Sequence, residues 1–236
     1  MKLLLTSGGI KNPSIQNALI ELLGKPIADS TALFVPAGMY PFPGGGVGAM
    51  DAARGRAKSP MTELGWKSLG LLELTALTSI QRESWVPALE EADALLVWGG
   101  NVLYLRHWMR ESGLADLLPT LSNLVYVGIS AGSIVTGVHN CDHEWNLGFA
   151  PTGSSMASDD NTALGLVNFA LTVHLDNPDP MFEDNSLVNV SKWAQQQPFA
   201  TYALDDQSAV KVAGSHVEVV SEGHWHLFEG NSPNSK

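Results

Sequence analysis

The sequence predicts an α/β fold, a three-layer sandwich with a mostly parallel central sheet and a C-terminal antiparallel meander. Over the first 130 residues, short apolar runs alternate with segments of helical periodicity. The runs are apolar along their whole length, which is typical of parallel strands covered by helices on both faces. The tail, 201–228, instead alternates apolar and polar residues between turn signals, as antiparallel strands do.

The expected elements follow in order along the chain. Strands are predicted at 3–6, 32–35, 71–74, 94–97 and 125–129. Helices are predicted at 13–23, 61–69 and 84–91, and over 103–121 with a break at 112–113. Asn12 can cap the first helix and Pro13 can occupy its first turn. The stretch 41–46, rich in proline and glycine, is expected to be a loop, as is the polar region 140–162, while 164–175 returns to the core and 183–196 forms a helix.

The composition limits the class of protein. The chain has 236 residues, 44 % of them hydrophobic and 16 % charged, which predicts one globular domain over residues 1–236. With 13 Lys and Arg against 24 Asp and Glu, the net charge is -11, so neither nucleic acid nor an anionic membrane is an expected partner. A single cysteine, Cys141, excludes an intramolecular disulfide framework.

The N-terminal apolar run breaks at Ser7-Gly8-Gly9 and is too short for a signal peptide or a membrane span. A cytoplasmic protein is therefore expected. It is also predicted to be a monomer or a homodimer.

The strongest functional signal is Gly128-Ile129-Ser130-Ala131-Gly132, between the strand at 125–129 and a helix start. This Gly-x-Ser-x-Gly layout is typical of a nucleophile elbow, where glycines remove side chains that would clash in a sharp turn. A serine hydroxyl needs a general base within hydrogen-bond reach. Among the seven histidines, His174 alone follows a core run that ends in a loop, which predicts it as that base.

The acid that orients the histidine is expected at another strand end. Asp206 is the predicted third member of the triad and Asp205 the alternative, because both follow the apolar run at 202–204. On composition alone, a simple polar turn is the better explanation of this pair. The amide groups of Gly100 and Ala131 are the predicted oxyanion hole.

The segment 139–144 contains His139, Cys141, Asp142, His143 and Glu144, a composition that suggests metal ligands. Its spacing matches no zinc pattern, and a serine nucleophile needs no metal, so no metal and no cofactor are predicted. Asp142, His143 and Glu144, together with Asn101, are instead predicted to contact substrate.

Four motifs in order, at 97–101, at 128–132, around His174 and at 203–208, resemble the peptidase E family of serine peptidases, which includes aspartyl dipeptidases and is related to cyanophycinase. The resemblance implies a class I glutamine amidotransferase-like fold, Ser130 as nucleophile, His174 as base, and Gly100 with Ala131 as the oxyanion hole. The family usually has glutamate where this chain has Asp206. Peptidase E also binds the substrate's aspartate through an arginine soon after the histidine, and this chain has no arginine after His174.

The sequence therefore predicts a serine peptidase that hydrolyses dipeptides or other short peptides from the N-terminal side through an acyl-enzyme, with Asp-X specificity left open. Two alternatives remain. One is an amidase acting on a small non-peptide or branched amide, and the other is a catalytically silent binding member of the fold.

Overall fold

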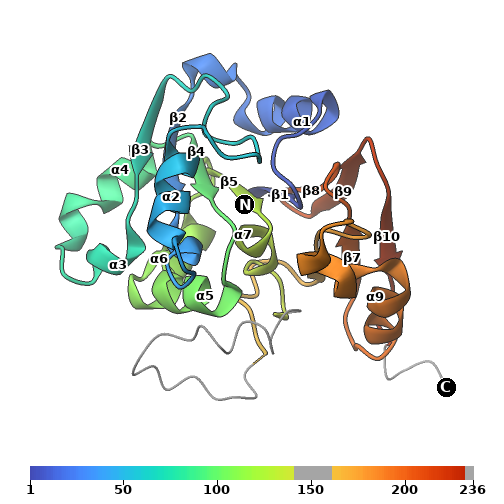
Figure 1. Cartoon of the computed structure of the whole chain (residues 1–236). Helices are drawn as coiled ribbons and strands as arrows, with labels where there is room; N and C mark the ends of the chain where they lie inside the picture. The colour runs from blue at the N-terminus through green and yellow to red at the C-terminus, as the bar shows by residue number, and fades with distance from the viewer. Residues whose placement is uncertain (141–160, 232–236) are drawn as a thin grey trace.

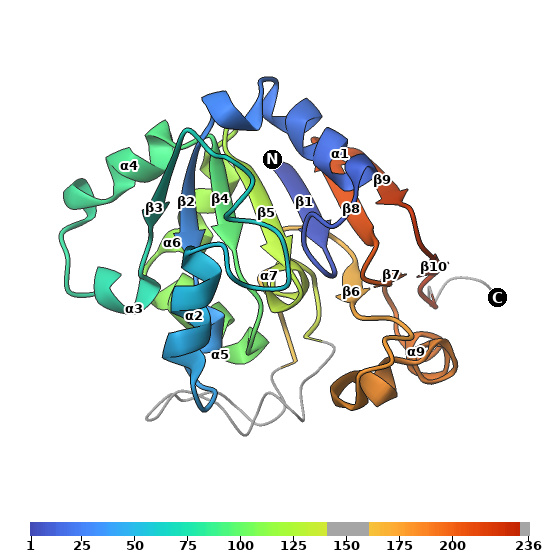
Figure 2. The same cartoon turned by 45° about the horizontal axis from the view of Figure 1, so that its top comes forward.

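The computed structural model describes residues 1–140 and 161–231, and its largest element is a seven-stranded sheet in the order β3-β2-β4-β5-β1-β8-β9 (Figures 1 and 2). The strands are β1 (Lys2–Thr6), β2 (Thr31–Val35), β3 (Ser68–Leu71), β4 (Ala94–Val97), β5 (Val125–Ile129), β8 (Ser208–Ala213) and β9 (His216–Ser221). The pairs from β3 to β1 are parallel, whereas β8 and β9 are antiparallel to their neighbours. The predicted α/β class, with a mostly parallel central sheet, is confirmed.

Helices cover both faces of this sheet. They are α1 (Pro13–Leu23), α2 (Gly45–Ala53), α3 (Leu74–Leu77), α4 (Val86–Glu91), α5 (Val102–Glu111), α6 (Leu114–Leu117) and α7 (Ala131–Ile134). Alternate residues of the strands contribute to two hydrophobic clusters: one includes residues of α1 and α2, the other residues of α3 to α7. Because β4 and β5 are buried at every position, each of their residues packs under a helix on one face or the other.

The first helix begins as its sequence predicts. The side chain of Asn12 accepts a hydrogen bond from the amide of Ile15 at 2.9 Å, and Pro13 occupies the first turn. Gly24 ends the helix in a left-handed conformation, with φ of 71°.

A smaller three-stranded sheet lies beside β8 and β9, near α9 (Leu187–Ala194), as Figure 1 shows. It contains β6 (Ala170–Thr172), β7 (Thr201–Leu204) and β10 (Trp225–Phe228). β7 is central and pairs in parallel with β6 and antiparallel with β10. The prediction of one meander over 201–228 is therefore wrong in part: β8 and β9 extend the large sheet, but β7 and β10 do not. Alternation of residues predicts a strand, but it does not identify the strand's partner.

The predicted helix over 61–69 does not form. Met61 is buried, and its carbonyl accepts a hydrogen bond from Trp66 Nε1 at 2.9 Å, while its amide donates to the Glu63 side chain. These hydrogen bonds from side chains to the backbone stabilise a compact loop in place of the helix. The third strand consequently begins at Ser68 rather than at residue 71, and Leu74 already lies in α3.

The predicted loop over 41–46 is shorter than expected, because α2 starts at Gly45. A side chain at this position would lie 1.9 Å from the Met39 carbonyl, so only glycine allows the helix to begin there. Short 3₁₀ segments complete the connections: η1 (Ile27–Asp29), η2 (Ala37–Met39), η3 (Arg82–Ser84), η4 (Leu118–Thr120) and η5 (Pro180–Asn185).

Most of the predicted loop over 140–162 falls outside the described residues. At its ends, His139 and Thr162 form an isolated antiparallel bridge. Among the helices of the described residues, none combines the length and the apolar character needed to cross a membrane.

Replacing Gly132 should test how tightly the elbow packs on β4. A Cβ at Gly132 would lie 2.2 Å from the Val97 carbonyl oxygen, so Gly132→Ala should lower the free energy of unfolding by about 1–3 kcal/mol or more. Gly46→Ala is the control, because its Cβ would meet nothing within 4 Å inside α2, and it should be neutral or stabilising by up to about 1 kcal/mol. Urea denaturation measures both. Equal effects of the two substitutions would contradict this packing.

Candidate active site

Ser130 lies between β5 and α7, at the carboxyl edge of the sheet. Its backbone has φ of 52° and ψ of -117°, a conformation that costs energy in any residue other than glycine. The Ser130 amide donates to the Thr6 carbonyl at 3.1 Å, and the Ser130 carbonyl accepts from the amides of Ser133 and Ile134. These bonds hold the strained serine between β1 and α7.

The two glycines of the motif allow this turn. A Cβ at Gly128 would lie 2.6 Å from the carbonyl oxygen of Gly132, and a Cβ at Gly132 would meet β4. Strand, serine and helix therefore approach each other more closely than side chains would permit.

His174 reaches Ser130 from the segment after β6. Its Nε2 lies 2.9 Å from Ser130 Oγ, and its Nδ1 lies 2.6 Å from Asp206 Oδ1. Phe182 stacks on the imidazole with ring centroids 4.1 Å apart. The serine, histidine and aspartate named by sequence reasoning thus form one hydrogen-bonded chain.

The Asp206 carboxylate accepts three further hydrogen bonds. Ser7 Oγ donates to Oδ1 at 3.0 Å, while Asn177 Nδ2 and Lys11 Nζ donate to Oδ2 at 2.9 and 3.3 Å. Burial acts to raise the pKa of Asp206. The hydrogen bond and charge of His174, the charge of Lys11 and the Ser7 hydroxyl outweigh it and hold this pKa well below its usual range.

Asp205, the alternative acid, faces away from the histidine. Its Oδ1 accepts from the Gln207 amide at 3.0 Å and from Ser208 Oγ, and its Oδ2 accepts from the His224 amide at 2.8 Å. Asp205 therefore organises the turn between β7 and β8, whereas Asp206, its neighbour, points to His174.

The predicted oxyanion donors belong to two segments near the serine, the segment that follows β4 and the start of α7. A Cβ at Gly99 would be 3.1 Å from Ser130 Cβ and 3.6 Å from Oγ, so the backbone leading to Gly100 runs beside the nucleophile. Ala131 is the first residue of α7, and its amide has no acceptor within that helix.

The four residues predicted to contact substrate fall into two groups. Asn101 is fully buried, and its Oδ1 caps α5 by accepting from the Tyr104 amide at 2.8 Å. Asp142, His143 and Glu144 lie outside the described residues. His139 packs against the rings of Trp193 and Phe199. In the parts of the chain that the structure covers, no three His, Cys, Asp or Glu side chains are grouped to hold a metal.

Sequence reasoning missed Ser7, Lys11 and Asn177, which bind the carboxylate, and Phe182, which stacks on the imidazole. A signal existed for Ser7. It follows a buried strand directly, and the carboxyl ends of parallel strands meet at one edge of the sheet. The other three depend on how loops fold back over that edge.

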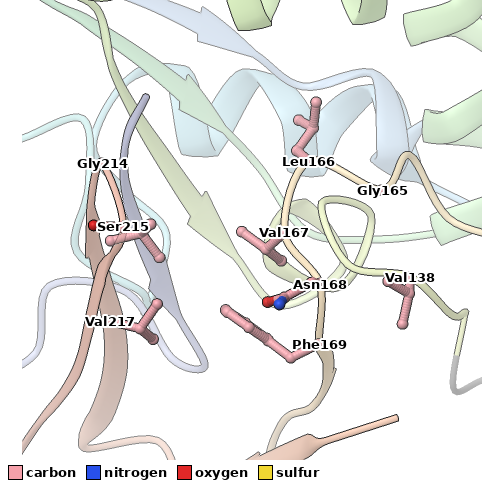
Figure 3. A pocket seen from close by; sticks show the side chains of 10 residues that line it. Val138, Gly165, Leu166, Val167, Asn168, Phe169, Gly214, Ser215 and Val217 are labelled. Atoms are coloured by element: carbon pink, nitrogen blue, oxygen red, sulfur yellow. The ribbon is translucent and has the colours of Figure 1, made fainter. Parts of the chain in front are cut away.

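A cavity of about 540 Å³ lies away from this site (Figure 3). Figure 3 shows Val167 and Phe169 facing the hairpin residues Ser215 and Val217 across it. This hairpin, formed by β8 and β9, is bonded to the start of β1, because the Gly214 amide donates to the Met1 carbonyl. Ser7, which belongs to the active site, follows the opposite end of β1. None of the residues that line the cavity belongs to the hydrogen-bonded chain of Ser130, His174 and Asp206.

A serine hydroxyl bonded to an imidazole, with a carboxylate behind it at the edge of an α/β sheet, is the arrangement of a serine hydrolase. Residues 3–220 match the model of Peptidase family S51, and the chain belongs to this family. It is therefore a peptidase, and the resemblance found in the four motifs is confirmed.

Two solved structures share the fold. A candidate peptidase E protein from Listeria monocytogenes EGD-e is 19 % identical, with a TM-score of 0.63, over 94 % of this chain and 98 % of that one. A peptidase from an acI-B1 Actinobacterium is 17 % identical, with a TM-score of 0.66, over 98 % of this chain and 91 % of that one. No curated protein matches the sequence significantly.

The depressed pKa of Asp206 should appear as pH-dependent stability. The ionised carboxylate stabilises the folded state fully above the unfolded pKa, about 3.9, and this contribution is lost as the pH falls through the lower folded value. Asp206→Asn should cost about 1–3 kcal/mol of unfolding free energy at pH 6 and clearly less at pH 3. Urea denaturation of both proteins at the two pH values measures this, and a cost that does not change with pH would contradict it.

Proposed function

We propose that this chain hydrolyses dipeptides and other short peptides from the N-terminal side through an acyl-enzyme on Ser130. The observation that carries the proposal is the continuous chain from Ser130 Oγ to His174 Nε2, at 2.9 Å, and from His174 Nδ1 to Asp206 Oδ1, at 2.6 Å. Membership of Peptidase family S51 supports a peptide bond as the target.

In the proposed first step, Ser130 Oγ attacks the carbonyl carbon while His174 Nε2 takes the hydroxyl proton. His174 then donates this proton to the leaving amine, and an acyl-serine ester remains. Water attacks the ester in the second step, with His174 again as the base. Throughout, Asp206 stays ionised, orients the imidazole and stabilises its charged form.

The negative charge that develops on the carbonyl oxygen needs preorganised donors. The amides of Gly100 and Ala131 are proposed for this role, because one lies on the backbone beside Ser130 and the other begins α7. Backbone donors fixed by β4 and α7 need no reorganisation during the reaction.

The basis for Asp-X specificity is weak in this chain. No arginine follows His174, and the two lysines before the terminal one are Lys192 and Lys211. Lys211 is buried, and its Nζ is bonded to Glu21 at 2.6 Å and to Glu218 at 2.8 Å, so it is already neutralised. We therefore propose that a neutral N-terminal residue is accepted at least as well as aspartate.

The lack of an arginine after His174 also favours a second candidate, an amidase that acts on a small non-peptide or branched amide. The same three residues would perform this reaction, since amide and peptide cleavage share their chemistry.

Replacing the nucleophile tests the mechanism. Ser130→Ala should lower kcat/KM on the best dipeptide by at least about 10³-fold, because no hydroxyl remains to form the ester. The control is Ser30→Ala, which removes a buried hydroxyl bonded to the Pro26 carbonyl before β2 and should leave activity unchanged. A fluorophosphonate probe should label the parent at Ser130 and spare the variant. Unlabelled parent protein would indicate a silent binding member.

A substrate panel tests the specificity. Asp-Leu, Ala-Leu and Leu-Leu dipeptides and simple amides should be compared by kcat/KM. We expect the neutral dipeptides to be hydrolysed at least as fast as Asp-Leu, because Lys211 is held by two glutamates. A strong preference for Asp-Leu would contradict this expectation, and faster turnover of the simple amides would favour the amidase.

A further inference from the structure

We infer that Ser7 is a positioning residue of this peptidase, whose hydroxyl joins the backbone of His174 to the carboxylate of Asp206. The inference rests on the proposed function of the triad. Ser7 Oγ accepts a hydrogen bond from the His174 amide at 2.8 Å and donates one to Asp206 Oδ1 at 3.0 Å. One hydroxyl can do both, because it has one donor and two lone pairs.

The hydroxyl is attached to a rigid part of the fold. Ser7 is 0 % exposed and directly follows β1, which lies between β5 and β8 in the large sheet. Its amide donates to the Ser208 carbonyl at 3.2 Å. The next residue packs as closely, since a Cβ at Gly8 would lie 2.9 Å from Asp206 Cβ. Ser7 therefore fixes the positions of His174 and Asp206, which lie on loops, relative to the sheet.

His174 needs such an anchor. Its φ of 57° is unfavourable for a residue with a side chain, and it persists only when surrounding bonds fix it. Ser7 accepts from the amide of His174, and the His174 carbonyl accepts from the Asn177 amide at 3.1 Å. Loss of the Ser7 hydroxyl removes one of these two restraints on the backbone that aims the imidazole at Ser130.

Ser7 also acts on the oxygen of Asp206 that faces the histidine. Oδ1 accepts from both His174 Nδ1 and Ser7 Oγ, whereas Lys11 and Asn177 donate to Oδ2. Ser7 thus restrains the carboxylate at the atom that sets the orientation of the imidazole. Because the hydroxyl of Ser7 is bonded to His174 and Asp206, its loss should change turnover more than binding.

The test is Ser7→Ala, assayed by the rate of fluorophosphonate labelling and by kcat and KM on the best dipeptide. We expect labelling and kcat to fall about 10- to 100-fold and KM to change less than about threefold. Ser30→Ala, which also loses a fully buried hydroxyl, should match the parent in both assays even where its melting temperature falls. A Ser7→Ala protein that is labelled within twofold of the parent rate overturns the inference.

A double-mutant cycle separates positioning from general destabilisation. If Ser7 acts through Asp206, then Ser7→Ala combined with Asp206→Asn should slow labelling by clearly less than the product of the two single effects. Effects that multiply fully would contradict the proposed route. If Ser7→Ala does not fold, Ser7→Cys keeps a similar volume with a weak donor, and the same slowing is expected. Parent-like labelling of Ser7→Cys would then overturn the inference.

The outcomes distinguish the two proposals. Failure to label the parent at Ser130 would refute the proposed function, and the role of Ser7 would fall with it. A labelled parent with an equally reactive Ser7→Ala protein would refute the role of Ser7 alone.

Discussion

The carboxylate of Asp206 is the point where separate segments of the chain meet: the turn after β1, the loop after β6 and the turn between β7 and β8. It accepts hydrogen bonds from Ser7, Lys11, His174 and Asn177. Burial alone would favour its neutral form, and a neutral acid would stabilise a charged imidazole poorly. The four donors therefore do more than fix a side chain. They keep the Asp206 carboxylate ionised beside His174, and the sheet holds the segments that carry these donors at fixed positions.

Backbone strain is concentrated at the same place. Among the described residues, the non-glycine positions with positive φ are Ser130, His174 and Asp176, with values of 52°, 57° and 52°. Each is held by bonds to another segment: the Ser130 amide to Thr6, the His174 amide to Ser7, and the Asp176 side chain to the Leu187 amide. Strain of this kind persists only where the surroundings over-determine the backbone. The buried β1 and β5, which are parallel neighbours, provide that rigidity for Ser130.

The chain shares its fold with solved structures at identities of 17 and 19 %. Such a fold tolerates wide sequence change because each buried strand needs only apolar residues of suitable size, while the elbow needs glycine at specific points. Substrate preference depends on a few charged side chains at the edge of the sheet and can vary independently. Here Lys211, a cation of β8 that follows His174, is bound to Glu21 of α1 and Glu218 of β9. Membership of the family and specificity for aspartate are therefore separate questions.

The α/β class, most of the parallel strands, and the candidate pair Ser130 and His174 could be predicted from the sequence alone. These rest on local rules: apolar runs, capping by Asn12, and glycines at a sharp turn. The sequence did not determine the helix boundaries between residues 45 and 74, because side chains such as Glu63 and Trp66 bond to the backbone and replace the helix. That Asp206 rather than Asp205 faces His174, and that Ser7 and Asn177 bind its carboxylate, is seen only in the folded chain. Adjacent residues in a turn point in different directions, and which of them meets the histidine depends on contacts between segments more than 150 residues apart, as Ser7 and His174 are.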